Sequence, residues 1–385
     1  MKILYHHRIR SKDGQYVHIE ELTRALAARG HEIIMVGATN LEAERLGTSA
    51  GFIGLLRRWL PRPFYEILEL VYAIGDYVRL RAAVRRHAPD CLYERYNLFT
   101  PSGVWLKRRV GLPMLLEVNA PLVHERGHHG GLALNGLARW SECFVWRGAD
   151  RVLPVTRVLA DYVVAASVPE ERITVVPNGI DPDAFAGPCD GAAAKRRLGL
   201  DGRLVLGFTG FVRDWNGLDK AIDVIAEDGG RHDLHLLLVG DGPARERLEA
   251  YAAERGIAGR LTVTGVVERD RIVDCVCAFD VALVPDVVPY ASPLKLFEYM
   301  GLGRAIVAPA RPNLLEILVD GDNALLFDVD APGAFADAIV RICGDAALRR
   351  RLGEEARRTI DARRLTWRHN AERVEALFEE LFATA

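Results

Sequence analysis

The alternation of short β-rich runs with longer helical patterns constrains the fold of this chain more than any other feature. The first apolar run, "KILY" at residues 2–5, leads into a helical pattern, and this succession recurs along the 385-residue chain. Parallel strands joined by helical crossovers, with helices on both faces of the sheet, are typical of this alternation. The pattern therefore predicts an α/β fold with doubly wound parallel sheets.

Two such sheets are expected, because 385 residues exceed one ordinary core. In the first half we predict strands at 2–5, 32–36, 90–93, 113–118, 151–155 and 173–176. In the second half we predict strands at 204–207, 234–239, 261–264, 281–284, 305–308 and 324–327. Residues 177–202, rich in Pro, Gly and Asp, are interpreted as the linker. Two Rossmann-like domains facing a cleft are predicted, 1–184 and 185–367, followed by one or two amphipathic helices broken near "LTW" at 365–367.

Composition limits the classes of function. Hydrophobic residues make up 50% of the chain and charged residues 26%, as in soluble globular enzymes. A net charge of −2 gives no reason to expect a nucleic-acid partner. No apolar run reaches the length of a membrane span, and "MKILYHHRIRSK" is interpreted as a first strand and not a signal peptide. The six scattered cysteines are interpreted as buried, reduced thiols of a cytoplasmic protein.

Ligands of doubly wound sheets bind beyond the carboxyl ends of the strands, so the loops there are candidate sites. Gly14 stands ahead of a helix expected to start around Tyr16; it either lets backbone N–H groups approach an anion or is a plain turn glycine. In "GFTGFVRDWNGLDK", Gly210 precedes Arg213, a basic residue that suits a phosphate. Lys220 is expected inside the next helix, so Arg213 is favoured.

The loop "LLLVGDGPARERLE" at 236–249 resembles a dinucleotide fingerprint only superficially. Arg245 occupies the position of the third glycine, and a proline follows the second. A hydride-transfer enzyme is therefore disfavoured. Gly240 and Gly242 are interpreted as a tight turn that brings the backbone close to a nucleotide, or as a turn and nothing more.

The stretch "PYASPLKLFEYMGLG" at 289–303 places one lysine and one glutamate in an apolar run. If a helix starts at Ser292 or Pro293, its first free N–H groups belong to Leu294 and Lys295. Lys295 and Glu298 share a helical face, which suits a diphosphate and a sugar hydroxyl. The alternative is a surface ion pair, but the apolar neighbours favour a partly buried pair with a ligand.

The order and spacing of several motifs resemble glycosyltransferase family 4. The motifs are "DGQYVHIEELTRALAARGHEI", "RITVVPNGIDPDAF", "LLLVGDGPARERLEAYA" and "SPLKLFEYMGLGRAIVAP". The resemblance implies a retaining transferase of the GT-B architecture that uses a nucleotide-diphosphate sugar, with no cofactor and no metal. It also implies that a final helix, about residues 368–385, crosses back onto the first domain.

Site roles are also implied by this resemblance. Glu298 would bind the ribose of the donor, and the amides of Leu294 and Lys295 would hold its diphosphate. Phe211 and Asn216 occupy the positions of the family's arginine and lysine, so Arg213 would substitute. Tyr290 stands where the family has a first glutamate, and Asn119 where a histidine often touches the sugar. The expected catalytic residues are Arg213, Lys295 and Asn119. The expected donor-binding residues are Gly14, Gly210, Asn216, Gly242, Gly265, Val267, Tyr290, Ser292, Leu294, Lys295 and Glu298.

Several alternatives remain open from the sequence. The acceptor would be a glycan, a lipid-linked compound or a small molecule; a catalytically silent nucleotide-sugar-binding partner, an epimerase and a phosphorylase are the rival functions. "HERGHHG" places three histidines close together, and we expect an acceptor-facing or exposed loop there and not a metal site. The apolar runs "FIGLL" and "FYEILELVYAIGDYV" either rest on an anionic membrane surface or form amphipathic helices that cover the first sheet. The basic residues around these two runs are Arg57, Arg58, Arg62, Arg79, Arg81, Arg85 and Arg86.

Overall fold

The computed structural model describes residues 1–9, 14–37, 61–129, 131–185 and 189–384. The chain divides into two compact units, Met1–Pro177 with Arg368–Ala385 (unit 1) and Asn178–Trp367 (unit 2). The boundary lies at residue 177 and not near 185, because Asn178 and Ile180 bond within unit 2. The N–H of Ile180 donates to the carbonyl of Leu365 at 3.1 Å.

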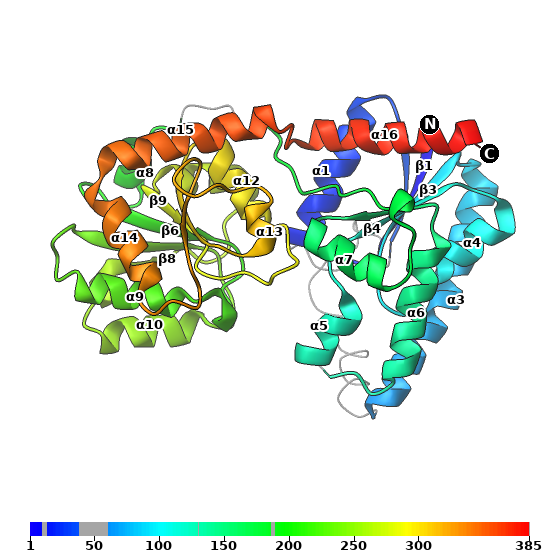
Figure 1. Ribbon diagram of the computed structural model, residues 1–385, viewed down its shortest axis with the longest axis horizontal. Helices are drawn as coiled ribbons and strands as arrows, with labels where there is room; N and C mark the ends of the chain where they lie inside the picture. Colours follow the sequence, from blue (N-terminus) through cyan, green and yellow to red (C-terminus); the bar gives the residue numbers. More distant parts are fainter. Residues whose placement is uncertain (10–13, 38–60, 130, 186–188, 385) are drawn as a thin grey trace. The chain divides into compact units, whose positions relative to one another are not determined.

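Unit 1 is built on a five-stranded parallel sheet in the order β2-β1-β3-β4-β5 (Figure 1). Its strands are β1 (Lys2–His6), β2 (Glu32–Val36), β3 (Cys91–Arg95), β4 (Met114–Val118) and β5 (Arg151–Pro154). Its described helices before residue 177 are α1 (Gly14–Ala28), α3 (Arg62–His87), α4 (Ser102–Val110), α5 (Leu122–His129), α6 (Asn135–Gly148), α7 (Arg157–Ala165) and the 3-10 helix Glu170–Arg172. All five residues of β3 and of β4 are buried, as expected for strands covered on both faces.

The strand predicted at residues 173–176 is wrong. The segment runs beside β5, and the N–H of Thr174 and of Val176 donate to the carbonyls of Val152 and Pro154, both at 3.0 Å. It forms only an isolated bridge, between Ile173 and Val152. Pro154 has no N–H, so it cannot return the hydrogen bond that would continue the ladder.

Unit 2 is built on a six-stranded parallel sheet in the order β11-β10-β9-β6-β7-β8. Its strands are β6 (Leu204–Thr209), β7 (Leu234–Val239), β8 (Leu261–Val263), β9 (Val281–Leu283), β10 (Ala305–Pro309) and β11 (Leu325–Phe327). Its helices are α8 (Gly191–Arg197), α9 (Leu218–Glu227), α10 (Arg245–Glu254), α11 (Arg269–Cys277), α12 (Leu294–Gly301), α13 (Pro312–Leu315), α14 (Ala334–Gly344) and α15 (Ala346–Ala362). Two 3-10 helices, η3 (Asp214–Asn216) and η4 (Ala258–Arg260), complete it.

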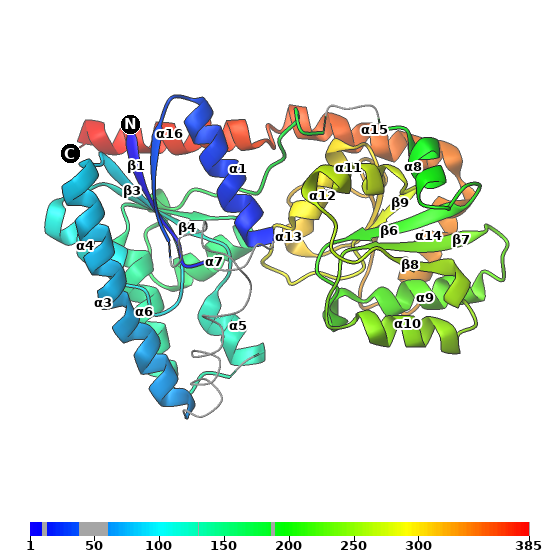
Figure 2. The same cartoon turned by 180° about the vertical axis from the view of Figure 1, so that it is seen from behind.

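Helices cover both faces of the unit 2 sheet, as Figure 2 shows from behind. One core cluster packs α8, α11, α12 and the later turns of α15 against the sheet, and a second packs α9, α10, α14 and the first turns of α15 against the other face. The predicted fold class, two doubly wound parallel sheets, is thereby confirmed. The interpretation of residues 177–202 as a plain linker needs correction, because α8 lies within that range.

The end of the chain forms two helices, as predicted. α15 ends at Ala362 and α16 (Trp367–Thr384) follows, so the break includes Leu365 and Thr366. Residues 368–385 belong to unit 1. Ala371, Val374 and Phe378 on α16 are fully buried there, and Arg29 forms ion pairs with Glu372 and Glu375.

The expectation that all six cysteines are reduced thiols is wrong for two of them. Cys189 and Cys277 form a disulfide with a Cα–Cα distance of 5.3 Å, so they are not reduced thiols. They are separated by 88 residues, and the fold brings the segment before α8 next to the end of α11. Among the described residues, no helix is both long enough and apolar enough to cross a bilayer.

Candidate active site

The start of α12 lies beyond the carboxyl ends of the unit 2 strands, where the sequence predicted a ligand site. Pro293 is the N-cap and has no N–H, and the N–H of Leu296 donates to its carbonyl at 3.0 Å. Within the described residues, the N–H groups of Leu294 and Lys295 have no protein acceptor. Free N–H groups and the positive end of a helix dipole together favour an anion.

The segment ahead of α12 is held by two asparagines. The backbone N–H of Asn178 donates to Ser292 Oγ at 3.1 Å, and its side-chain amide donates to the Ser292 carbonyl. Asn313 Nδ2 donates to the carbonyl of Ala291 at 2.6 Å. Ser292, predicted to bind the donor, is buried and engaged in fixing the chain. The "PNGID" motif therefore positions the first turn of α12.

Lys295 supplies a cation at this helix start. Its Nζ lies 3.4 Å from the centroid of the Phe208 ring, and no carboxylate of the described residues forms an ion pair with it. Burial lowers the pKa of Lys295 to about 7, against the opposing attraction of Glu298. Glu298 lies one turn further along α12 and is partly buried. An anion at the helix start would stabilise the charged form of Lys295.

The glycines of the neighbouring loops are required by close backbone packing. A Cβ on Gly240 would lie 2.1 Å from the carbonyl oxygen of Gly210, and one on Gly242 would lie 2.2 Å from that of Val212. Gly210 has φ +116°, and a Cβ there would contact Lys295 Nζ at 3.4 Å. These positions admit only glycine, which brings the loops after β6 and β7 together and leaves room for the lysine.

Arg213 is exposed in the loop after β6. Its guanidinium lies 4.9 Å from the ring centroid of Phe211 and 5.9 Å from that of Trp215. Asn216 is buried, and its Oδ1 accepts the N–H of Arg213 at 2.7 Å, so this amide shapes η3. Lys220 is exposed within α9, as expected.

The remaining donor-side predictions lie in the loops before α12 and after β8. Tyr290 is only 5% exposed. The side chain at this position, which is a glutamate in the family, is therefore largely buried. Gly265 has φ +71° and forms an isolated bridge with Gly240. Val267 is partly buried and packs against the core.

A buried polar network lies at the carboxyl end of β4 in unit 1. Glu117 Oε2 accepts from Tyr93 OH at 2.7 Å and lies 2.8 Å from His18 Nε2, while Oε1 accepts from Arg95 and from Asn119 Nδ2. Burial alone would raise the pKa of Glu117, but His18 and Arg95 hold it below its usual range. Asn119, the predicted sugar contact, is therefore oriented by a charged carboxylate.

The partners of Glu117 were not identified from the sequence. Tyr93 and Arg95 lie on β3, and His18 lies on α1. His6 and Glu94 form a second buried pair, in which His6 Nδ1 lies 2.6 Å from Glu94 Oε2. The available signal was charged residues inside strands whose every residue is buried, in "CLYER" and "MLLEV". Gly14 is the first residue of α1.

The predicted loop of histidines contains a short helix. His124 and His128 lie on α5 with ring centroids 4.3 Å apart, and His128 Nδ1 lies 2.9 Å from the carbonyl of His124. In the part of the chain that the structure describes, no three His, Cys, Asp or Glu side chains are grouped as a metal site.

Two family models match consecutive parts of the chain. Residues 13–179 match the glycosyl transferase 4-like domain, and residues 203–345 match glycosyl transferases group 1. A 2-deoxystreptamine glucosyltransferase of Streptomyces kanamyceticus is 31% identical, over 70% of this chain and 74% of the relative. This chain belongs to glycosyltransferase family 4. A D-inositol 3-phosphate glycosyltransferase of Acidothermus cellulolyticus is 29% identical, over 96% of this chain and 86% of the relative.

Solved structures show that this glycosyltransferase has the GT-B fold. Sucrose-phosphate synthase from Thermosynechococcus elongatus superposes with a TM-score of 0.79 at 19% identity, covering 100% of both chains. HepE from Anabaena, solved in complex with UDP, gives a TM-score of 0.75 at 16% identity, covering 99% of this chain and 100% of HepE.

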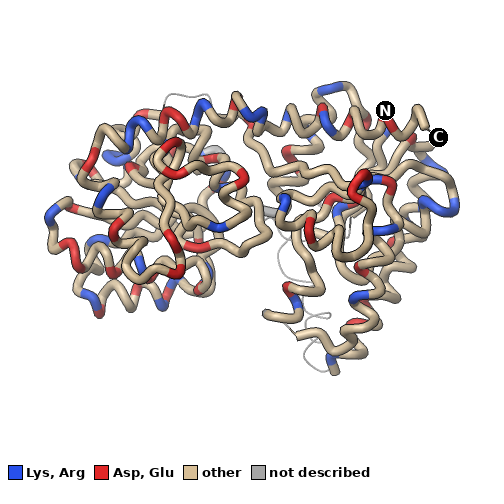
Figure 3. The backbone as a smooth tube through the Cα atoms, viewed as in Figure 1, with Lys and Arg blue, Asp and Glu red and all other residues tan. Residues whose placement is uncertain are grey.

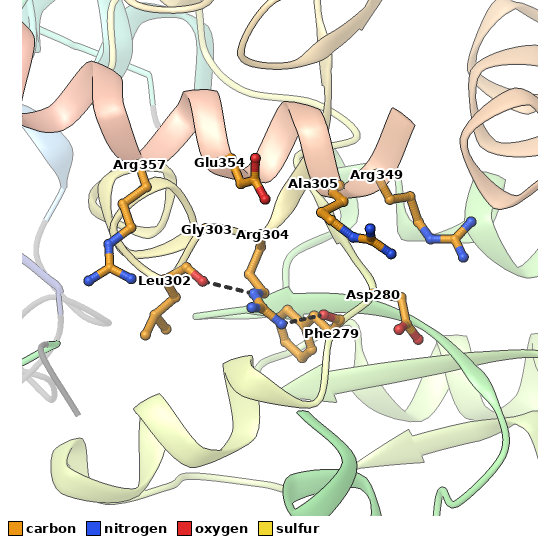
Figure 4. Close-up of a pocket in the computed structure, with 10 residues that line it drawn as sticks. Phe279, Asp280, Leu302, Gly303, Arg304, Ala305, Arg349, Glu354 and Arg357 are labelled. Atoms are coloured by element: carbon orange, nitrogen blue, oxygen red, sulfur yellow. Dashed lines mark hydrogen bonds between the residues drawn. The ribbon is translucent and has the colours of Figure 1, made fainter. Parts of the chain in front are cut away.

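A hollow of about 340 Å³ in unit 2 is lined by several arginines (Figure 4). It lies at the amino ends of β9 and β10, away from the start of α12. Arg304 donates there to the carbonyls of Leu302 and Phe279 at 3.0 and 3.2 Å, and Arg349 donates to that of Ile342. These two arginines therefore donate hydrogen bonds to backbone carbonyls at or just after the ends of α11, α12 and α14.

Proposed function

We propose that this protein is a retaining glycosyltransferase that moves a sugar from a nucleotide-diphosphate sugar to a hydroxyl acceptor without a metal. The acceptor would be a glycan, a lipid-linked compound or a small molecule. The observation that supports this proposal is the first turn of α12, which combines two amides without protein acceptors, an ammonium with a lowered pKa and a carboxylate. That combination suits a diphosphate and a ribose.

Each group has a distinct proposed role. The N–H groups of Leu294 and Lys295 donate to diphosphate oxygens, and the ammonium of Lys295 neutralises their charge. Arg213, held over two aromatic rings, adds a second cation from the loop after β6. Glu298 accepts hydrogen bonds from the ribose hydroxyls. In unit 1, Asn119 remains a predicted contact of the transferred sugar.

The proposed reaction needs no separate protein base. The bond between the anomeric carbon and the diphosphate oxygen breaks, and its electron pair stays on the diphosphate. The acceptor oxygen attacks from the same face, and its proton passes to the departing phosphate oxygen. The protein mainly stabilises the leaving group and orients the acceptor. An asparagine at position 119 is compatible with such a mechanism, because an amide does not titrate.

The donor site can be tested with matched variants. We expect Lys295→Ala and Glu298→Gln each to raise the Kd of the preferred nucleoside diphosphate about 10- to 100-fold, because each removes a charge-assisted contact. Lys220→Ala and Glu254→Gln, both at exposed helix positions, are the controls and should bind normally. A thermal-shift screen of uridine, guanosine and adenosine diphosphates first identifies the preferred ligand, and isothermal titration calorimetry then measures its Kd for each variant. Normal binding by both site variants would refute the site.

Turnover separates the enzyme from a silent binding partner. A panel of nucleotide sugars, with and without acceptors, should give slow donor hydrolysis or transfer with retention at the anomeric carbon. Binding without turnover under every acceptor would favour the silent partner instead. Activity that requires an added divalent cation, and is lost with a chelator, would contradict the metal-independent mechanism.

A further inference from the structure

α3 carries apolar side chains outward as well as inward, where Ala73 and Leu80 are fully buried. Six of the outward side chains are between 46% and 60% exposed. They are Phe64, Ile67, Leu68, Val71, Ile74 and Val78, which we call the α3 stripe. At 3.6 residues per turn, all six lie within about 60° of Val71 around the helix axis. The stripe is therefore one continuous apolar face and not a scatter of single residues.

The acidic residues of the same helix point inward. α3, all of whose residues are described, contains three acids: Glu66, Glu69 and Asp76. Glu66 is 4% exposed and accepts the N–H groups of Ala133 and Leu134 at 2.8 and 2.7 Å. A helix at a water-facing surface usually keeps its charged residues on the exposed face, where α3 has the stripe.

The other two acids are neutralised inside unit 1. Asp76 is 1% exposed and pairs with Arg8, at 3.4 Å, and with Arg79. Glu69 pairs with Arg126 at 2.7 Å. Charge pairing thus holds the acids on the inward face of α3, beside the buried Ala73 and Leu80, and the outward face keeps no acid of this helix.

The charge next to the stripe is positive. Arg85 and Arg86 are exposed and continue the same face toward the end of α3, again within about 60° of the line through Val71. The adjacent helix α4 ends in Lys107, which pairs with Asp150 at 2.7 Å, and in Arg108 and Arg109, which are exposed. Figure 3 shows blue Lys and Arg segments at its right edge, the side on which α4 lies in Figure 1. An apolar stripe with basic neighbours is the pattern of helices that lie in the interface of anionic membranes.

The position of α3 places the stripe at the ligand edge of its own sheet. The helix connects β2 to β3, which run parallel, so it runs antiparallel to both and begins at their carboxyl edge. Figure 1 shows the first turns of α3 extending past the sheet. The apolar half of the helix, Phe64 to Val78, is the half nearer that edge.

We propose that the α3 stripe docks unit 1 on an anionic lipid surface. The apolar side chains insert among the acyl chains near the headgroups, and the basic end of α3 with that of α4 contacts acidic headgroups. The basic residues Arg57 and Arg58, named from the sequence, lie outside the described residues and carry no part of this inference. The docking is independent of the donor chemistry proposed above, and it suits a lipid-linked acceptor if that chemistry holds.

Vesicle co-sedimentation tests the docking without any donor or acceptor. The full chain is mixed with phosphatidylcholine vesicles that contain either no phosphatidylglycerol or a substantial fraction of it. We expect partition to rise with phosphatidylglycerol and to fall with salt. Val71→Glu with Ile74→Glu should lower partition at least about tenfold, because it places charge in the apolar face. Val340→Glu is the matched control, since Val340 is 49% exposed and Val71 is 51%.

Three outcomes would overturn the proposal. Equal partition of the wild type, Val71→Glu/Ile74→Glu and Val340→Glu would show that the stripe takes no part. A wild-type dimer in analytical ultracentrifugation that the double variant converts to a monomer, with no vesicle binding, would assign the stripe to a second copy. A large drop in Tm of the double variant, with no vesicle binding by the wild type, would assign it to internal packing.

Discussion

At the scale of single residues, Lys295 gives the site a pH dependence. Its pKa is lowered to about 7 by burial, so the unliganded protein loses this charge as the pH rises. A diphosphate binds the charged form, so binding above pH 7 must take up a proton. We expect the Kd of the nucleoside diphosphate to rise roughly tenfold per pH unit above about pH 7.5, where the terminal phosphate is already ionised.

Calorimetry between pH 6.5 and 9 measures this slope, and buffers of different ionisation enthalpy report the proton uptake. Lys295→Arg should bind with a flatter profile, because arginine stays charged over the whole range. A wild-type Kd that does not change between pH 7.5 and 9 would contradict the assigned role.

Local spacing made Lys295 and Glu298 predictable, whereas no spacing rule could find the network around Glu117. Residues three positions apart in sequence are neighbours on the surface of a helix, and the proline ahead of Lys295 marks where the helix starts. The buried pair of His18 and Glu117 joins residues 99 apart, and the Cys189–Cys277 disulfide joins residues 88 apart. Such partners are decided by strand order, which the local pattern does not contain.

At the scale of elements, Asn178 links the start of unit 2 to the start of α12. Asn178→Ala removes the side-chain hydrogen bond to the carbonyl of Ser292, which is buried. We expect a loss of about 1–3 kcal/mol in the free energy of unfolding, because a buried acceptor is left unpaired. The apparent affinity for the donor should also fall, since the first turn of α12 would be less ordered.

Urea unfolding and donor KM check this expectation. Asn135→Ala is the control, because Asn135 is exposed and its side chain, as far as the described residues go, bonds only the nearby carbonyl of Leu132. A variant of Asn178 with unchanged stability and unchanged KM would show that the motif does not position the helix.

Elements themselves were predictable where apolar runs were long. The wrong strand at residues 173–176 has the right composition, and its failure depends on the missing N–H of Pro154 on the neighbouring strand. The helix α8 was missed because "GAAAKRR" is short and lies among turn residues.

At the scale of the whole molecule, the residues alone predicted two sheets, and the resemblance to family 4 predicted the return of the last helix. Periodicity shows that α16 is amphipathic, but it does not say which sheet the helix covers. The structure answers this with contacts to unit 1: the buried Asn370 donates from Nδ2 to the carbonyl of Pro177 at 2.7 Å, and at the surface Arg151 pairs with Glu380. The buried face of α16 is thus part of the core of unit 1.

The dependence of unit 1 on α16 leads to a last prediction. Phe378 is fully buried, whereas Phe382, one turn further on the same helix, is 39% exposed and stacks on it with ring centroids 6.4 Å apart. Phe378→Ala should lower the free energy of unfolding of unit 1 by about 3–5 kcal/mol, because it leaves a cavity. Phe382→Ala should cost less than about 1.5 kcal/mol, since it removes mainly the ring contact. Chemical unfolding, with a nucleoside diphosphate added to stabilise unit 2 selectively, resolves the two units. Equal losses for the two variants would mean that α16 is not packed as a core element of unit 1.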